Sequence, residues 1–160
     1  MNGITLITIK LSPGDVAFAT TEAVARFNFN RAIGNQNYRG SAPTWVEQLA
    51  REVSGCLGEL AIGRWMDKYP FSVFEERKMG DVGEFEVRTT AYVTGKLILT
   101  KDDNPERKYL LVTLPTYDSA NIVGWMWGYE AQVEQHWDEK MRMPAYMVKQ
   151  EFLHDPASLL

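Results

Sequence analysis

The chain has 160 residues, of which 45% are hydrophobic and 24% are charged. This length suits one domain, and this balance is typical of a folded globular protein and excludes a disordered chain. Seventeen Lys and Arg against 21 Asp and Glu give a formal charge of -4, which argues against a protein that wraps nucleic acid with its whole surface. Any nucleic-acid partner would need a local basic patch or bound cations.

Cys56 is the only cysteine, so an internal disulfide is excluded and a thiolate zinc site within the chain would lack its partners. The N-terminal stretch has no basic leader and no small-residue cleavage site. No apolar stretch approaches the length that crosses a bilayer. We therefore expect a cytoplasmic protein that has no membrane partner.

The first part of the chain predicts one strand and one helix. In residues 1–10, apolar residues alternate with threonines: Ile4, Leu6 (then Ile7) and Ile9. This stretch is rich in β-branched residues, which indicates a short strand. Ser12 and Pro13 then predict a helix start, with Ser12 as the N-cap and the helix ending at about Ile33. The stretch 34–43 is dense in turn residues and predicts a loop.

A second, longer helix is predicted by a capping-box pattern, Thr44 with Glu47 three residues later, and by apolar residues at helical spacing up to about Lys68. We interpret residues 1–160 as one domain, in which 1–43 form an N-terminal extension and 44–153 form the core.

Three glycines lie inside this helix, although each costs a helix about 0.5–1 kcal/mol relative to alanine. Gly55 and Gly63 are four residues before and after Glu59, so one stripe carries a carboxylate between two bare backbone positions. That face could lie very close to a sheet or a ligand, and the three glycines, Gly58 included, indicate that something favours small residues in this helix. Taken alone, the stripe favours tight helix packing and a solvated Glu59.

After Pro70 the pattern changes to that of strands, at residues 71–77, 84–92, 96–100, 108–114 and 121–127. The turns between the first three predict an antiparallel meander. Residues 128–140 predict a short helix and residues 145–150 a final strand. The whole pattern indicates an α/β protein of the α+β kind.

The strand at 84–92 carries the residues that could perform chemistry. In an extended strand Glu86 and Arg88 lie side by side on one face, because alternate side chains point the same way. Asp81 precedes the strand, and a bend at Val82-Gly83 could bring its carboxylate to the same place. A bare Glu-x-Arg pattern more often marks the solvated face of an edge strand.

The order of these motifs resembles that of the PD-(D/E)XK nuclease superfamily, and most closely its small phage nuclease-like proteins. In that group a G-x-L-G-E-L-A helix precedes D-V-G-x-x-E-V-R-T-T, and here these read GCLGELA at 55–61 and DVGEFEVRTT at 81–90. Residues 122–131 and 145–153 are similar to the closing elements of that group, so the resemblance covers about 54–153. It implies a restriction-endonuclease-like core, in which a central mixed sheet with an antiparallel meander is flanked by helices.

The resemblance also implies a site in which Asp81 and Glu86 hold Mg²⁺ or Mn²⁺, with the carbonyl of Val87 as a further ligand and Glu59 reaching in from the helix. Magnesium prefers oxygen ligands, which fits this set. The implied activity is metal-dependent hydrolysis of DNA phosphodiester bonds. Such a phage DNA-processing enzyme would act in the host-cell cytoplasm, and a homodimer is one arrangement that cuts both strands.

Arg88 stands where the superfamily usually has a lysine. An arginine stays protonated with a pKa above about 12, so Arg88 cannot act as a general base, although it could grip a phosphate and stabilise transition-state charge. Lys96 could supply the missing ammonium if the strand register brings it near. The substitution leaves an alternative open, namely a catalytically inactive nuclease-like module that binds DNA or a protein.

A surface for DNA is less clearly marked than the carboxylate motif. Several basic residues, most of them in pairs, could form local patches or be scattered surface charges: Arg77-Lys78, Lys101, Arg107-Lys108, and Lys140 with Arg142. Trp125, Trp127 and Tyr129 alternate and could stack on unpaired bases. Such a stripe more often belongs to the core or to a subunit interface.

Overall fold

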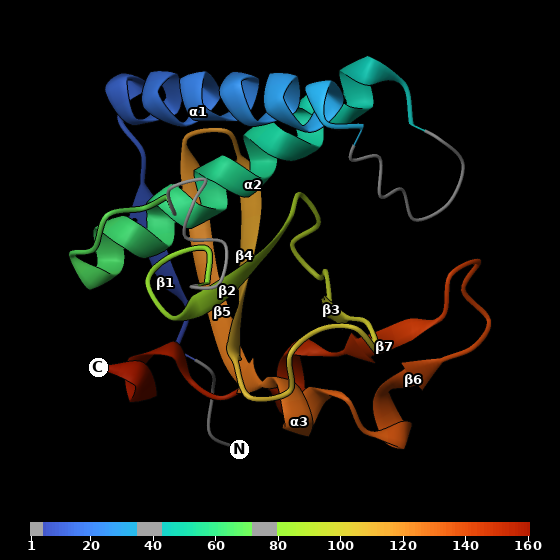
Figure 1. The fold of residues 1–160 in the computed structure, drawn as a ribbon. Helices are drawn as coiled ribbons and strands as arrows, with labels where there is room; N and C mark the ends of the chain where they lie inside the picture. Colours follow the sequence, from blue (N-terminus) through green and yellow to red (C-terminus); the bar gives the residue numbers. More distant parts are fainter. Residues whose placement is uncertain (1–4, 35–42, 72–79) are drawn as a thin grey trace.

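Two long helices cover one face of a mixed β-sheet (Figure 1). The computed structural model describes residues 5–34, 43–71 and 80–160. The helices are α1 (Pro13–Ala32) and α2 (Trp45–Met66). α2 packs on the sheet and α1 packs on α2, so the protein has the α+β architecture that the sequence predicts.

Both helices begin where the sequence indicates. Ser12 and Asp15 exchange two hydrogen bonds between side chain and backbone N–H, at 2.9 and 3.1 Å. Thr44 and Glu47 make the same reciprocal pair at the start of α2. These bonds satisfy N–H groups that the first helical turn leaves without an intrahelical partner, so the predicted N-cap and the predicted capping box are confirmed.

The larger sheet has the order β1 (Ile7–Lys10), β5 (Ser119–Trp127), β4 (Lys108–Thr116), β2 (Phe85–Thr90). β2 runs parallel to β4, whereas the other neighbours are antiparallel, so the predicted central mixed sheet is confirmed. Within the described residues β2 is an outer strand, and one edge of its backbone faces away from β4. That edge carries the candidate site.

A second, smaller sheet lies against the opposite face of β4. It has the order β3 (Leu97–Leu99), β7 (Ala145–Val148), β6 (Trp137–Asp138). Alternation along β4 sends Leu110 and Val112 into the core beneath α2, and sends Tyr109 and Leu111 into the core beneath the smaller sheet. β4 is therefore buried on both faces.

The predicted antiparallel meander is wrong for its second and third strands. β2 pairs with β4 in parallel, and β3 leaves that sheet to pair with β7. The physical reason is burial: β4 is apolar on both faces and takes a neighbour at each edge, while Leu97 and Leu99 are fully buried in the second core. The expected first strand, 71–77, lies outside the described residues except for the buried Phe71.

The region after β5 is less helical than the sequence predicts. Instead of one helix over 128–140, the chain forms α3 (Gly128–Ala131), the 3₁₀ turn η2 (Glu134–His136) and β6. Pairing of Trp137 with Tyr146 of β7 takes the chain into the smaller sheet and ends the helix early. Two further 3₁₀ turns follow, η3 (Gln150–Phe152) and η4 (Pro156–Leu159). Among the described helices, none combines the length and the apolar character that a bilayer span requires.

Candidate functional site

A tight turn brings Asp81 alongside β2. Val82 and Phe85 exchange two backbone hydrogen bonds of 3.1 and 3.0 Å, and Gly83 within this turn has φ +60°, a conformation that strains residues with a side chain. A Cβ on Gly80 would lie 2.4 Å from the Phe85 carbonyl oxygen, so the backbones approach very closely there. The bend that the sequence predicts is present, and it places Gly80 and Asp81 beside the outer edge of β2.

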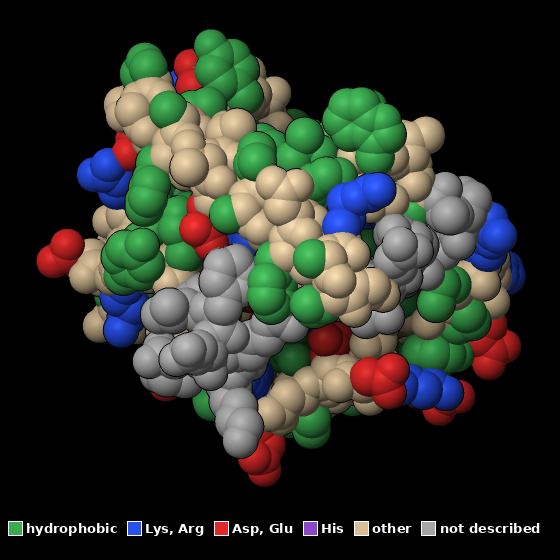
Figure 2. Space-filling view, turned by 45° about the horizontal axis from the view of Figure 1, so that its top comes forward, with side chains coloured by type: hydrophobic (Ala, Val, Ile, Leu, Met, Phe, Trp, Pro, Cys, Tyr) green, Lys and Arg blue, Asp and Glu red, His purple; other side chains and the backbone are tan. Residues whose placement is uncertain are grey.

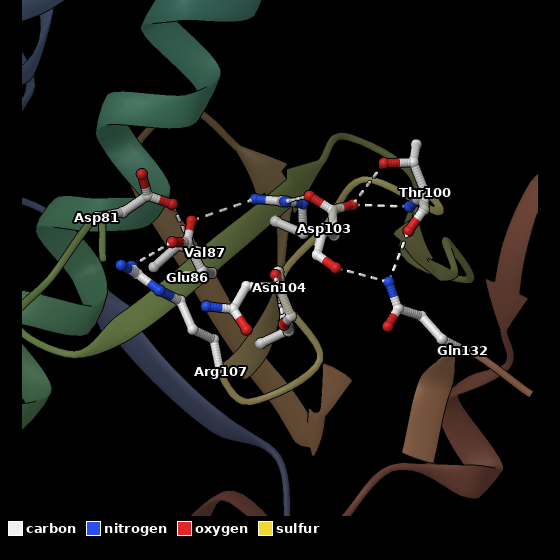
Figure 3. Close-up of polar contacts among 10 residues, drawn as sticks. Asp81, Glu86, Val87, Thr100, Asp103, Asn104, Arg107 and Gln132 are labelled. Carbon is white, nitrogen blue, oxygen red and sulfur yellow. Dashed lines mark hydrogen bonds and ion pairs between the residues drawn. The ribbon is translucent and has the colours of Figure 1, made fainter. Parts of the chain in front are cut away.

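The Asp81 carboxylate is held against that edge. Its Oδ2 accepts a hydrogen bond of 2.8 Å from the Val87 backbone N–H (Figure 3). The N–H and C=O of one residue in an extended strand point to the same side, so the Val87 carbonyl also faces the outer edge, toward Asp81. Two of the predicted metal ligands therefore lie on one side of β2.

Glu86 brings a second carboxylate to the same place. Burial raises its pKa, and the Asp81 carboxylate, which lies within hydrogen-bonding reach, raises it further. Arg88 and Arg107 oppose the rise, since Arg107 Nη1 lies 2.6 Å from Glu86 Oε1 and Arg88 Nη1 lies 3.8 Å from Glu86 Oε2. Asp81 and Glu86 thus form a close pair of acids, which we call the carboxylate pair.

Arg88 is held by groups that the sequence did not single out. Its Nη2 lies 2.9 Å from Asp103 Oδ1, and its guanidinium lies over the Tyr109 ring at 5.1 Å from the centroid. Asp103 in turn accepts from the Thr100 N–H at 2.7 Å (Figure 3). Gln132 Nε2 donates to the carbonyls of both Thr100 and Asp103, each at 2.8 Å. The loop after β3 therefore fixes the guanidinium beside Glu86.

Glu59 occupies a different environment. Both of its carboxylate oxygens accept from Arg26 of α1, each at 2.7 Å, and the residue is only 5% exposed. Burial raises the pKa of Glu59 to about 7, although the hydrogen-bonded Arg26 opposes the rise; the Asp81 carboxylate adds to it. The expectation of a solvated Glu59 is wrong, because α1 covers this face of α2. Its role as a metal ligand stays a prediction.

The three glycines of α2 serve different purposes. A Cβ on Gly58 would lie 2.0 Å from Thr89 Oγ1 of β2, and one on Gly63 would lie 2.7 Å from Pro70 Cβ, whereas Gly55 has nothing within 4 Å. A close approach to the sheet therefore occurs at Gly58, whereas within the predicted stripe Gly63 packs against the chain that follows α2 and Gly55 approaches no described group. Thr89 Oγ1 is buried beside Gly58 and has no hydrogen-bond partner among the described residues.

Sequence reasoning missed Arg26 and Asp103. Arg26 follows Ala19 and Ala23 at the spacing of one helix face, and both alanines are fully buried. A cation on such a face signals a buried partner, so this spacing could have identified it. Asp103 lies in a turn-rich stretch, DDNPE, where carboxylates commonly cap turns, and nothing in the sequence marks it as the partner of Arg88.

Lys96 does not reach the site by the expected route. It precedes β3, and β3 pairs with β7, so no strand register aligns Lys96 with β2. Lys96 nevertheless lines the same cleft as Arg88, one of about 830 Å³.

The aromatic stripe packs largely on itself. Trp127 and Tyr129 are stacked at a centroid distance of 5.8 Å, and the Trp125 indole N–H donates to Ser158 Oγ at 2.9 Å. Lys108 Nζ lies 5.0 Å from the centroid of the Trp127 ring. Trp125 and Trp127 are half-buried, as expected of a stripe with a packing role, but Tyr129 is exposed.

A smaller pocket of about 320 Å³ adjoins the carboxylate pair; its lining includes Gly80, Arg107, Lys108 and Trp127. On the face shown in Figure 2, Lys and Arg side chains are spread among Asp and Glu and do not gather in one patch. The predicted basic pair at 77–78 lies outside the described residues.

The donor groups beside β2 are two carboxylates and one carbonyl. No cluster of three or more His, Cys, Asp or Glu suited to a metal ion occurs in the parts of the chain that the structure describes. Comparison of the chain with protein-family models, with curated proteins and with solved structures gave no match. The arrangement of the carboxylate pair is therefore the main guide to what the protein does.

Proposed function

We propose that this protein is a metal-dependent nuclease with a restriction-endonuclease-like core, which hydrolyses DNA phosphodiester bonds and serves in phage DNA processing. The observation that supports it is the carboxylate pair, because Asp81 and Glu86 come together on the edge of one strand as the resemblance requires. Two acids within hydrogen-bonding reach repel each other when both are ionised, and a bound cation relieves that repulsion.

The groups at the site suit Mg²⁺ or Mn²⁺. Both ions favour oxygen ligands, and Asp81, Glu86 and the Val87 carbonyl offer oxygen atoms at one edge of β2. Such an ion, when bound, would polarise a phosphate oxygen and make a coordinated water more acidic. Glu59 remains a fourth candidate ligand only if its carboxylate leaves Arg26.

Arginines would contribute charge rather than accept protons. Arg88 and Arg107 flank Glu86, and neither can serve as a general base. A guanidinium that pairs with a carboxylate can pair with a phosphate in the same geometry, so either arginine could hold the substrate phosphate once the cation neutralises Glu86. Lys108, in the adjoining pocket, adds a further positive charge.

The test is cleavage of plasmid DNA with Mn²⁺ by the native protein and by Asp81→Asn, Glu86→Gln and Glu84→Gln variants. The first two substitutions keep a hydrogen-bonding side chain and remove one charge. Glu84 lies in the turn just before β2 and its side chain is 70% exposed, so Glu84→Gln is the matched control. We expect a rate loss of about 100-fold or more in the first two variants and a native rate in the control. Equal rates in all four proteins would exclude the site.

One observation favours the second candidate, a nuclease-like module that binds DNA or a protein without cleaving. Positive side chains already surround the acids: Arg107 and Arg88 neutralise Glu86, and Arg26 neutralises Glu59. A site satisfied in this way has less need of a metal ion. Metal-independent binding of DNA or a protein, with no cleavage under any divalent ion, would establish this alternative.

A further inference from the structure

The cleft lined by Arg88 and Lys96 lies beyond the carboxylate pair, between α2, the end of β2 and the smaller sheet. Its volume of about 830 Å³ is near the upper end of the range of about 300–1,000 Å³ typical of ligand sites. The floor is apolar and includes Ile98, Leu111 and Met147. The turn that joins β2 to β3 forms one wall and lies below α2 in Figure 1.

Charge is distributed unevenly around this cleft. Arg51 of α2, Arg88 of β2 and Lys96 before β3 contribute one cation each, and none of the described residues that line the cleft is acidic. Arg51 and Lys96 are exposed, and neither makes an ion pair or hydrogen bond with a described residue. The pKa of Glu47, which hydrogen bonds to the N-cap residue of α2 lower, is lowered further by the charge of Arg51 one helical turn away. Arg88 is already paired with Asp103, so Arg51 and Lys96 supply the excess positive charge of the cleft. In a protein with a formal charge of -4, this local positive charge favours an anionic ligand.

An aromatic ring stands at the same wall on a well-fixed turn. Tyr92 is 77% exposed, and its ring contacts no other ring or cation among the described residues. The Tyr92 carbonyl accepts from the Gly95 N–H at 2.8 Å, and Gln150 Nε2 donates to the carbonyls of Val93 and Gly95 at 2.8 and 2.9 Å. The backbone that presents the ring is thus held by the chain after β7, although nothing described covers the ring itself.

We propose that this cleft binds an unpaired segment of nucleic acid, with Arg51 and Lys96 contacting its phosphates and Tyr92 stacking on a base. Cations that follow a backbone, together with an exposed ring, are the combination that single strands require. A duplex keeps its bases stacked on one another and cannot use the ring. The apolar floor accommodates the faces of sugars and bases.

Arg88 links this cleft to the carboxylate pair, because its guanidinium lies 3.8 Å from Glu86 and the residue also lines the cleft. A strand that lies in the cleft would therefore lead toward the proposed cleavage site. This inference names the form of the substrate and rests on the proposed function for the cleavage step only. Binding itself needs neither a metal ion nor the carboxylate pair.

The test measures fluorescence anisotropy of a labelled oligo-deoxythymidine and of a duplex of equal length, in EDTA so that cleavage cannot occur. The variants are Arg51→Gln with Lys96→Gln, and Tyr92→Ala. Matched controls are Lys10→Gln with Lys149→Gln, two exposed cations outside the cleft, and Tyr117→Ala, another exposed tyrosine. Thermal unfolding of each variant checks that the fold is intact.

We expect the native protein to bind the single strand more tightly than the duplex. The double charge variant should bind at least about tenfold more weakly. The slope of its log binding constant against log salt concentration should be smaller in magnitude by about 1.4, the value for two lost phosphate contacts. Tyr92→Ala should weaken binding at least about fivefold. Equal losses in the controls, a duplex bound as tightly as the strand, or no binding by the native protein would overturn the inference. Loss of cleavage alone, with binding retained, would instead count against the proposed nuclease.

Discussion

The acids predicted for one site lie in two different environments, between the helices and at the sheet edge. Glu59, between α1 and α2, is buried and receives two hydrogen bonds from one arginine. Asp81 and Glu86, at the edge of β2, lie close to each other, and Arg88 and Arg107 pair with Glu86. A buried acid with a full set of partners is explained by stability, whereas two acids that share a place invite a cation.

The largest expected effect comes from breaking the helical pair. Arg26→Met leaves the Glu59 carboxylate buried and unpaired, so we expect a loss of about 3–5 kcal/mol in the free energy of unfolding, measured by urea denaturation. The double variant Arg26→Met with Glu59→Met should recover most of that loss. Lys149→Met is the control, because its pair with Glu151 is exposed and is worth less than about 1 kcal/mol. A loss in Arg26→Met no greater than in the control would contradict the structural role of the pair.

A smaller effect would distinguish the two regions by metal binding. At a Mn²⁺ concentration of about ten times Kd, the native protein should gain about 1.4 kcal/mol in unfolding free energy, because the ion binds only the folded state. Asp81→Asn should gain nothing, whereas Glu59→Gln should gain as much as the native protein, since Arg26 occupies both oxygens of Glu59. If Glu59→Gln also lost the Mn²⁺-dependent gain in unfolding free energy, Glu59 would be a ligand of the ion, and the proposed difference between Glu59 and the carboxylate pair would be wrong.

The pH dependence of that gain provides a finer test. The pKa of Glu86 is raised above its ordinary value of 4.5, so the side chain takes up a proton at a higher pH than a free glutamate does. A protonated carboxyl is a poor ligand, and the Mn²⁺ gain should therefore be full at pH 8 and fall as the pH drops through the raised pKa. Thermal unfolding with and without Mn²⁺ between about pH 5 and 8 measures this. A gain that stays constant down to the ordinary value would show that Glu86 does not hold the ion.

The smallest effect concerns a buried polar atom that no described group satisfies. Thr89 Oγ1 lies against Gly58 where β2 meets α2. Thr89→Val replaces the hydroxyl by a methyl of similar size and removes the cost of burying it, so we expect a gain of about 1 kcal/mol in unfolding free energy. Thr113→Val at another buried threonine, 1% exposed, is the comparison. A loss of stability in Thr89→Val would indicate that the hydroxyl has a partner.

How far the site could be predicted from the sequence depends on the distance along the chain between its parts. The turn at Val82-Gly83 and the convergence of Asp81 with Glu86 involve neighbouring residues, so glycine positions and strand alternation were enough. The helix-face spacing could mark Arg26 as a cation with a buried partner, but the acid that each arginine meets was not predictable, since Arg107 lies 21 residues from Glu86 and Arg26 lies 33 residues from Glu59. Which cation meets which acid is decided by how the elements pack.

The same division holds for the fold. The sequence by itself determined the helix starts at Ser12 and Thr44, because each depends on hydrogen bonds between residues three apart. Only the tertiary structure decided that β2 pairs in parallel with β4, and that β3 joins a separate sheet. Strand alternation shows that a strand has a buried face but does not identify its neighbour, and the neighbour is chosen by burial of apolar side chains contributed from distant parts of the chain.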